Sequence, residues 1–190
     1  ILILSPCLEA EIPAIVEYNL VPSVSDILLA SAFSSYVQGK CIVYPIHVKI
    51  DTGMHRSGVD YYHAKALIRA INCLQNLIIE GLYSHFASAE NDVTFSKLQE
   101  TAFYSFVEEL SVLPKYVHLS NSAALINGLG IGTNLVRIGI MSFGIDTLNR
   151  TDVSHHLKPV MTFKSKISTI KSLNVGDSVG YSRTWTAQRP

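Results

Sequence analysis

Paired cysteines, a net charge and a long apolar run are all missing from this 190-residue sequence. Its three cysteines, Cys7, Cys41 and Cys73, have no paired spacing, which is typical of reduced core thiols and not of a disulfide framework or a zinc site. Fifteen basic residues balance fifteen acidic ones, so no overall field attracts nucleic acid or an anionic membrane. These absences favour a small-molecule partner and predict that the protein binds no metal and no nucleic acid.

No stretch reaches the roughly 20 apolar residues that a membrane-spanning helix needs. The opening segment ILILSP also lacks the basic start and the long apolar centre of a signal peptide. We therefore expect a cytoplasmic protein with no membrane partner. Because the sequence opens at Ile1 in mid-strand and stops at TAQRP just after a strand, we also expect an internal fragment of a longer chain.

Short apolar runs alternate with helical patterns along most of the chain. The candidate strands are ILILSP, VPSVS, IHVKIDTG, LIIEGLYSHF, YVHLSNS and LVRIGIMSFG. In the segment after Asp60, an expected N-cap, the apolar stripe is Ala64, Leu67, Ile68 and Ile71. In the segment from Thr94, it is Phe95, Leu98, Ala102, Phe106 and Leu110. This alternation predicts an α/β fold with a parallel sheet covered by helices.

Polar residues gather near the carboxyl ends of these candidate strands. They are Lys49 and Asp51, His85, His118 with Ser122, and Arg137. Because TIM-type (β/α)8 barrels build their active sites at this end, the pattern favours such a barrel over a doubly wound sheet. We expect residues 1–150 to form a partial barrel with the third to eighth of its eight strands. Residues 151–190 contain TFKSKISTIKSL and SVGYSRTWT, joined by NVGD, and predict the start of a C-terminal all-β domain.

The stretch VKIDTGMHRSGV places three charged residues directly behind an apolar run. Its Asp-Thr-Gly triplet matches that of aspartic proteases, but that chemistry needs an all-β domain and a second triplet or a dimer, so it is the minor alternative. Along a strand, His47, Lys49 and Asp51 share one face. Because the intervening Val48 and Ile50 should pack against helices, the polar face points into the barrel, toward its mouth.

At five places the sequence resembles the alanine racemases, a family of pyridoxal-phosphate enzymes with a barrel and a β domain. VKIDTGMHRSGV resembles their fifth barrel strand, GLYSHFASAEN the sixth, VHLSNSA the seventh, NLVRIGIMSFG the eighth and VGYSRTWTA the start of the β domain. The five motifs occur in the family's order and cover essentially the whole chain. The resemblance therefore implies a fold and a set of site residues.

Each matched residue inherits an expected role from this resemblance. Lys49 falls on a lysine that is often carbamylated, and Arg56 on an arginine that contacts the cofactor and the substrate carboxylate. His85 falls beside the pyridoxal ring, and Arg137 falls opposite its pyridine nitrogen. The other expected cofactor residues are Ser122, Gly139 and Ile140 at the phosphate, with Asn121 and His118 in support.

The implied activity is racemisation of L-alanine and D-alanine by two bases with pyridoxal 5′-phosphate, supplying D-alanine for peptidoglycan. The implied catalytic residues are Tyr181, acting across the interface of a homodimer, and His85. The second base in the family is the cofactor-bound lysine, which the resemblance puts upstream of Ile1, so we expect this chain alone to be inactive. Two alternatives stay open: a non-catalytic pyridoxal-phosphate-binding barrel, and a racemase of another amino acid such as serine.

Overall fold

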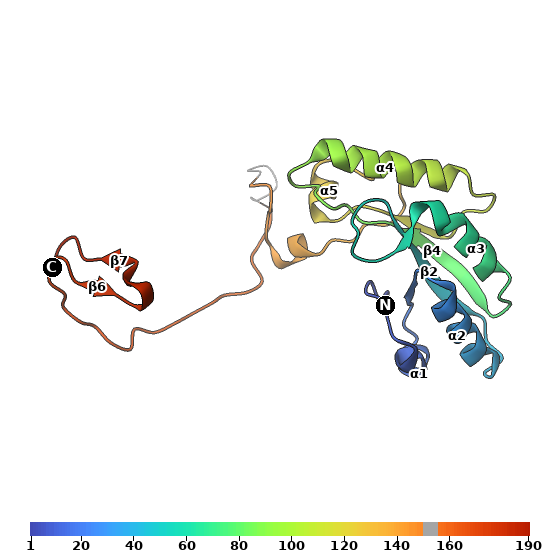
Figure 1. Cartoon of the computed structure of the whole chain (residues 1–190), viewed down its shortest axis with the longest axis horizontal. Coiled ribbons are helices and arrows are strands. Elements are labelled where there is room, and N and C mark those ends of the chain that lie inside the picture. Colours follow the sequence, from blue (N-terminus) through green and yellow to red (C-terminus); the bar gives the residue numbers. More distant parts are fainter. Residues whose placement is uncertain (150–155) are drawn as a thin grey trace. The chain divides into compact units, whose positions relative to one another are not determined.

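The computed structural model describes residues 1–149 and 156–190. The chain divides into two compact units, Ile1–Pro159 and Val160–Pro190 (Figure 1). The first unit holds a parallel sheet and its helices, and the second holds a short antiparallel pair of strands. The expected domain boundary between residues 150 and 151 lies outside the described residues.

A parallel sheet forms the centre of the first unit. Its strands pair in the order β1 Ser23–Val24, β2 Tyr44–Asp51, β4 Leu77–Tyr83 and β5 Tyr116–His118, while β3 Val59–Asp60 pairs with the end of β2. Sheet neighbours follow one another along the chain, and every pair is parallel, so each connection crosses back from one end of the sheet to the other. This sequential parallel order is the order that a barrel needs.

Single parallel bridges continue the strand order at the two margins of the sheet. Leu2 pairs with Val21, and Leu135 pairs with His118. The expected strands at ILILSP and LVRIGIMSFG are therefore wrong in extent, because each makes one bridge and the second passes into the 3₁₀ turn η3, Ile140–Phe143. Within the described residues these segments are paired on one side only, so they have half of the ladder hydrogen bonds that hold a central strand extended.

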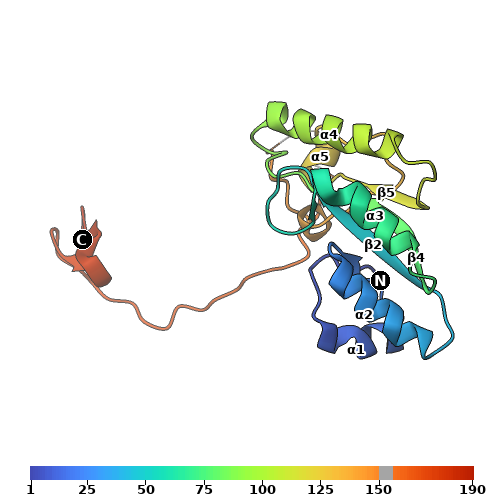
Figure 2. The ribbon, with the colours of Figure 1, turned by 45° about the vertical axis from the view of Figure 1, so that its right-hand side comes forward.

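The helices lie between the strands along the chain (Figure 2). They are α1 Ile12–Glu17, α2 Ile27–Gln38, α3 Ala64–Asn72, α4 Val93–Glu108 and α5 Ser122–Ile126, with 3₁₀ turns η1 Glu9–Glu11 and η2 Tyr61–His63. Three helices begin at side-chain caps, because Asp26, Asp92 and Asn121 each accept a hydrogen bond from the backbone N–H three residues later. The expected cap Asp60 instead closes η2 by accepting from the N–H of Tyr62.

The predicted apolar face is confirmed for α3 and only in part for α4, where the expected Phe106 is buried and Leu110, beyond the helix, packs against the core. The buried residues of α3 are Ala64, Leu67, Ile68 and Ile71. The buried residues of α4 are Ser96, Gln99, Phe103 and Phe106, whereas the expected Leu98 is 64% exposed. Gln99 belongs to the buried face because both polar atoms of its amide bond to the loop that follows β4.

The hydrophobic core of the first unit contains the sheet and helix side chains that face one another. Val48 and Ile50 of β2 are fully buried in it, as the strand alternation predicted, and Phe33, Ile71 and Phe103 join them from the helices. Burying a side chain of this size stabilises the fold by about 1.5–3 kcal/mol. This packing fixes which face of β2 turns away from the core.

Of the three cysteines, only Cys7 packs against the core. Cys7 is half-buried, and Cys41 and Cys73 are exposed, each as a free thiol. The expectation of core thiols is therefore wrong at Cys41 and Cys73. Both lie where the chain turns just after a helix, α2 and α3 respectively, and such turns lie at the surface.

The second unit contains the antiparallel strands β6 Ser178–Val179 and β7 Trp185–Thr186, with the 3₁₀ turn η4 Tyr181–Arg183 between them. The expected turn at NVGD is confirmed, since Asn174 and Asp177 bond to each other and Gly176 has a φ of +93°. The expected strand at TFKSKISTIKSL is wrong, because residues 162–173 contain no strand. Its apolar side chains, such as the 95% exposed Phe163, have no paired strand to pack against within the described residues.

Candidate active site

Four basic side chains come together on the sheet face that turns away from the helices. His47 lies on β2, His118 ends β5, His85 follows β4, and Arg137 follows the bridge at Leu135. Hydrogen bonds link them in one row, from His47 to His118, from His118 to Arg137 and from Arg137 to His85. We call this row the imidazole–guanidinium chain.

Arg137 is the centre of this chain. Its Nη1 donates to Nδ1 of His118 at 2.5 Å, and its Nη2 donates to Nδ1 of His85 at 3.1 Å. Nη2 also donates to the carbonyl oxygens of Ser84 (2.6 Å) and Leu119 (3.0 Å). Among the described residues, its buried Nε has no hydrogen-bond partner. A buried donor without an acceptor costs about 1–3 kcal/mol, so this nitrogen marks a place where a ligand acceptor would be stabilising.

Burial lowers the pKa of every imidazole in the chain, and the charge of Arg137 lowers each further. The pKa of His118 falls to about 2, and those of His47 and His85 fall to about 4. Burial also lowers the pKa of Arg137, to about 10, which leaves it a cation at neutral pH. At neutral pH the imidazole–guanidinium chain is therefore one cation and three neutral rings, of which His118 and His85 accept hydrogen bonds from Arg137 and His47 bonds to His118.

Tyr83 provides an aromatic surface against which the cations pack. Its ring stacks on His118 with centroids 4.6 Å apart and planes 6° from parallel. The guanidinium carbon of Arg137 lies 5.0 Å from the ring centroid, and Nζ of Lys49 lies 5.8 Å from it. The Tyr83 hydroxyl is 2.7 Å from Oγ of Ser23, which anchors the ring. Cation–π attraction of about 0.5–2 kcal/mol helps to hold two positive groups here.

The side chain of Lys49 lies on the face of β2 that the strand alternation predicted to point into the barrel. Its side chain is buried, and its Nζ donates to Oγ of Ser57 at 2.6 Å. Burial, followed by the charges of Arg56 and Arg137, lowers the pKa of this amine. Arg56 itself is exposed.

The Asp-Thr-Gly triplet forms the turn between Lys49 and Arg56. Oδ1 of Asp51 accepts hydrogen bonds from the backbone N–H groups of Gly53, Met54 and His55, at 2.9, 3.0 and 3.1 Å. A carboxylate that closes its own loop with three such bonds is a structural cap. This geometry argues against the protease alternative.

Ser122 and the segment that follows Arg137 form a small ring of backbone donors. Oγ of Ser122 accepts from the N–H groups of Gly139 (3.1 Å) and Met141 (3.3 Å). Ile140, between them, opens η3 and is 43% exposed. Asn121 holds Ser122 in place by capping α5. Backbone N–H groups that converge in this way can bind the oxygens of a phosphate.

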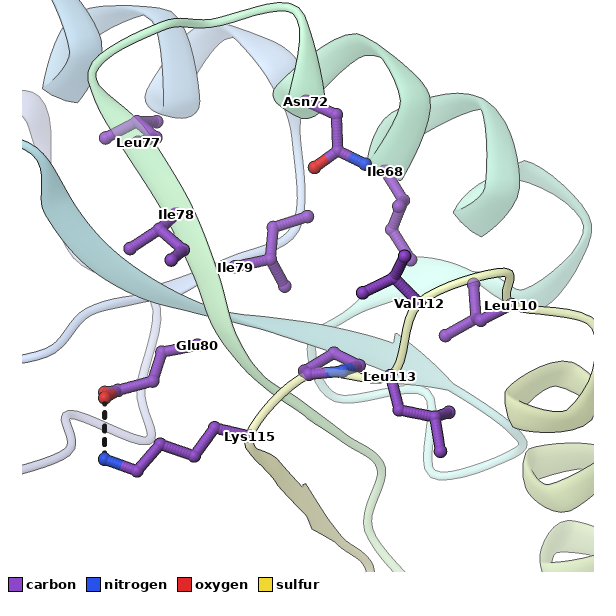
Figure 3. A pocket seen from close by; sticks show the side chains of 11 residues that line it. Ile68, Asn72, Leu77, Ile78, Ile79, Glu80, Leu110, Val112, Leu113 and Lys115 are labelled. Atoms are coloured by element: carbon purple, nitrogen blue, oxygen red, sulfur yellow. Dashed lines mark hydrogen bonds and ion pairs between the residues drawn. The ribbon is translucent and has the colours of Figure 1, made fainter.

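An apolar groove of about 510 Å³ lies at the opposite end of the strands (Figure 3). Its walls come from α3, the start of β4 and the segment 110–115, and its charged groups, Glu80 and Lys115, pair at 3.3 Å. Apart from this ion pair and the amide of Asn72 its lining is apolar, so it lacks the several convergent polar groups that a reaction site requires. In the ranges 1–149 and 156–190, no group of three His, Cys, Asp or Glu side chains could hold a metal, and no helix is long and apolar enough to span a membrane.

Comparison with known proteins identifies the family. The family model described as "Alanine racemase, N-terminal domain" matches residues 1–147. The chain belongs to the alanine racemase family. The alanine racemase of Halothermothrix orenii is 34% identical over 195 residues, which cover 98% of this chain and 50% of that protein. That of Carboxydothermus hydrogenoformans is 36% identical over 198 residues, covering 100% and 52%. The chain thus spans about half the length of the curated relatives it matches.

Solved alanine racemase structures share the fold. The biosynthetic enzyme of Pseudomonas aeruginosa superposes with a TM-score of 0.83 at 28% identity, covering 100% of this chain and 52% of that one. The enzyme of E. faecalis gives 0.82 at 28%, covering 99% and 52%. That of Bartonella henselae, described with covalently bound pyridoxal phosphate, gives 0.82 at 22%, covering 100% and 52%, a likeness of fold alone. The predicted fold class, a TIM-type barrel followed by the start of a β domain, is confirmed.

The structure of this alanine racemase family member brings most of the expected site residues into two clusters. His85, His118 and Arg137 share the imidazole–guanidinium chain. Ser122 and Gly139 share the ring of donors, and Asn121 and Ile140 are adjacent to them in the chain. Tyr181 belongs to the second unit, on η4, and its side chain is fully exposed.

Sequence reasoning missed three residues that support the site. Tyr83 lies in the motif GLYSHFASAEN, and His47 was placed on the polar face of the candidate strand IHVKIDTG, but no role was predicted for either. Gln99 is 1% exposed, and its Oε1 accepts from the N–H of Ala87 (2.9 Å) while its Nε2 donates to the carbonyl of His85 (3.2 Å). Its spacing of seven residues from Phe106 would have placed it on the buried face of α4.

Proposed function

We propose that the complete protein containing this chain interconverts L-alanine and D-alanine with pyridoxal 5′-phosphate, in the cytoplasm, and so supplies D-alanine for peptidoglycan. The observation that carries the proposal is the imidazole–guanidinium chain in a member of the alanine racemase family. Its central Arg137 has a free Nε–H among the described residues and lies two residues before the donor ring at Gly139. A cation and a phosphate-binding ring so arranged suit a heterocyclic phosphate.

The residues present fit the two polar ends of the cofactor. Nε of Arg137 can donate to a pyridine nitrogen, and the N–H groups that now bond to Ser122 can donate to phosphate oxygens. When bound, the cofactor would delocalise the electrons left by the α-proton of an amino acid. Arg137, with a pKa of about 10, keeps its proton at neutral pH, so a nitrogen facing it stays unprotonated. This weakens the electron sink and favours proton return over side reactions.

His85 is proposed to lie against the ring of the cofactor. Its Nδ1 accepts from Arg137, so in the neutral state its proton is on Nε2. With a pKa of about 4, it adds no second cation beside Arg137 at neutral pH. Gln99 holds the carbonyl of His85 from α4 and so fixes the backbone that carries this ring.

Lys49 is proposed to carry a carbamate. Carbamate formation needs a neutral amine, and burial together with nearby cations lowers the pKa of Lys49 in that direction. The amine lies 2.6 Å from Oγ of Ser57, whose own hydroxyl hydrogen can turn toward an anion formed on the amine. The carbamate would turn a buried cation into an anion able to orient Arg56, a bidentate donor suited to the substrate carboxylate.

Tyr181 is proposed to act as a base across the interface of a homodimer. Its phenol is fully exposed within its own unit, which leaves it available to a second copy. A phenol with an ordinary pKa near 10 needs nearby cations to act as a base at neutral pH. The cationic site built around Arg137 supplies such a field for a phenol that enters it.

The test uses the complete gene product that carries this sequence, reconstituted with pyridoxal 5′-phosphate. Incubation with L-alanine should form D-alanine, measured with a D-amino-acid oxidase assay, and Tyr181→Phe should abolish this activity. Tyr62→Phe is the matched control, because Tyr62 is 86% exposed and lies outside the site. A holoprotein that racemises no amino acid would favour the non-catalytic alternative, and a preference for serine would favour the other racemase.

A further inference from the structure

Two hydrogen bonds link Arg137 to His118 and His118 to His47, and each has only one possible donor. A guanidinium donates and never accepts, so Nδ1 of His118, 2.5 Å from Nη1, must carry a lone pair. Neutral His118 therefore has its proton on Nε2. That nitrogen is 2.9 Å from Nδ1 of His47, which must accept the proton and so carries its own hydrogen on Nε2. Both rings are thus assigned to the same tautomer.

The position of His47 is built into the sheet. The pairing of β2 with β4 shifts register between Ile46 and His47, which is a β-bulge. Opposite the ring, β4 has Gly81, and a Cβ at this position would overlap the His47 imidazole. The ring is 3% exposed, and its centroid is 5.9 Å from that of Tyr116. The bulge and the missing side chain together make room for one imidazole at this place.

His47 provides the hydrogen-bond acceptor that stabilises the Nε2–H tautomer of His118. Tyr83 covers a face of the His118 ring, and its hydroxyl is engaged with Ser23. Without His47, the Nε2–H of the fully buried His118 would lose its acceptor. The other neutral tautomer of His118 would turn an N–H toward the guanidinium and break the bond to Arg137.

We propose that His47 is a positioning residue, which holds His118 in the tautomer that accepts from Arg137 and thereby fixes the plane of the guanidinium. The assignment of tautomers rests on geometry alone. Its catalytic consequence rests on the proposed function, in which the same guanidinium faces the pyridine nitrogen.

The test measures tautomers directly, by 15N NMR of histidine-labelled protein at pH 7.5. His118 and His47 should each show a protonated Nε2 and an unprotonated Nδ1. His47→Asn places an amide oxygen near the position of Nδ1 and should preserve the His118 signals. His47→Leu removes the acceptor and should shift them toward a mixture of tautomers. His63→Leu is the control, because the His63 side chain is 79% exposed.

A second readout uses the complete protein once D-alanine formation is established. His47→Leu should lower kcat about tenfold, the equivalent of about 1.4 kcal/mol, with little change in KM, and His47→Asn should restore it. A proton on Nδ1 of His118, or wild-type signals and kcat in His47→Leu, would overturn the inference. If His47→Leu does not fold, the wild-type tautomers and His47→Asn decide. If no amino acid is racemised, the proposed function fails, and the tautomers still decide this inference.

Discussion

Gly81 of β4 lies against the imidazole of His47, and its replacement by alanine would place a methyl group within the space of that ring. The ring cannot move aside freely, because it is buried, bonded to His118 and held opposite the bulge that Glu80 makes in β4. Overpacking of this kind costs about 1–3 kcal/mol. Displacing the ring would also leave the Nε2–H of His118 without its acceptor, at about 1–3 kcal/mol.

We therefore expect Gly81→Ala to lower the free energy of unfolding by about 2–6 kcal/mol, a large share of the roughly 5–15 kcal/mol typical of a folded protein. Urea unfolding of Gly81→Ala, His47→Ala and the double variant measures this. His47→Ala removes the ring that the methyl group would meet, so the two changes should be non-additive by at least about 1 kcal/mol.

Gly39 offers a matched control. It ends α2 with a φ of −61°, and a Cβ there would meet only the carbonyl oxygen of Tyr36, at an ordinary 3.6 Å. Gly39→Ala should change the free energy of unfolding by less than about 1 kcal/mol. If Gly81→Ala behaves like Gly39→Ala, or if its effect adds to that of His47→Ala, the overlap with the imidazole is not what constrains position 81.

Three further predictions concern the site and its supports. Below pH 6.5 the three histidines His47, His85 and His118 bind protons in the unfolded chain but stay neutral in the folded one, because folding lowers their pKa values. The free energy of unfolding should therefore rise with pH between about 4 and 6.5 and fall on acidification. In urea titrations the change should be up to about 1.4 kcal/mol per pH unit for each histidine. Gln99→Leu removes two buried hydrogen bonds and should lower the free energy of unfolding by about 1–3 kcal/mol. An unchanged urea midpoint would show that Gln99 does not stabilise the loop that carries His85. Tyr181→Phe should alter stability by less than about 0.5 kcal/mol while abolishing racemisation by the complete protein, and retained activity would contradict its assignment as a base.

The sequence predicted the parts of the fold in which local pattern and burial agree. The buried run of β2 and the apolar stripe of α3 each depend on side chains that follow a single period. The stripe of α4 was partly misplaced because its buried face includes polar Gln99. Its spacing from Phe106 fits that face, but a polar residue adds nothing to an apolar pattern, and its burial depends on bonds to backbone groups at positions 85 and 87. The strand at residues 162–173 failed because a strand forms only where a neighbouring strand accepts its hydrogen bonds.

The site was predicted by resemblance more than by pattern. The motifs located His85, His118 and Arg137, and their carboxyl-end positions indicated that they would meet. The bond between His47 and His118 depends on a bulge and on a glycine in the next strand, which is a matter of register. Register is set when the strands pair in space, so this relation could not be predicted from either motif alone.

The imidazole–guanidinium chain takes its polarity from a single position. Because Arg137 can only donate, His118 presents a lone pair to it, and His47 in turn presents a lone pair to His118. A carboxylate at 137 could only accept, and each ring would then have to carry its proton on the nitrogen that now has none. The donor character of residue 137 thus decides which nitrogens of these rings carry protons, and with them which hydrogen bonds the rings can offer to a ligand.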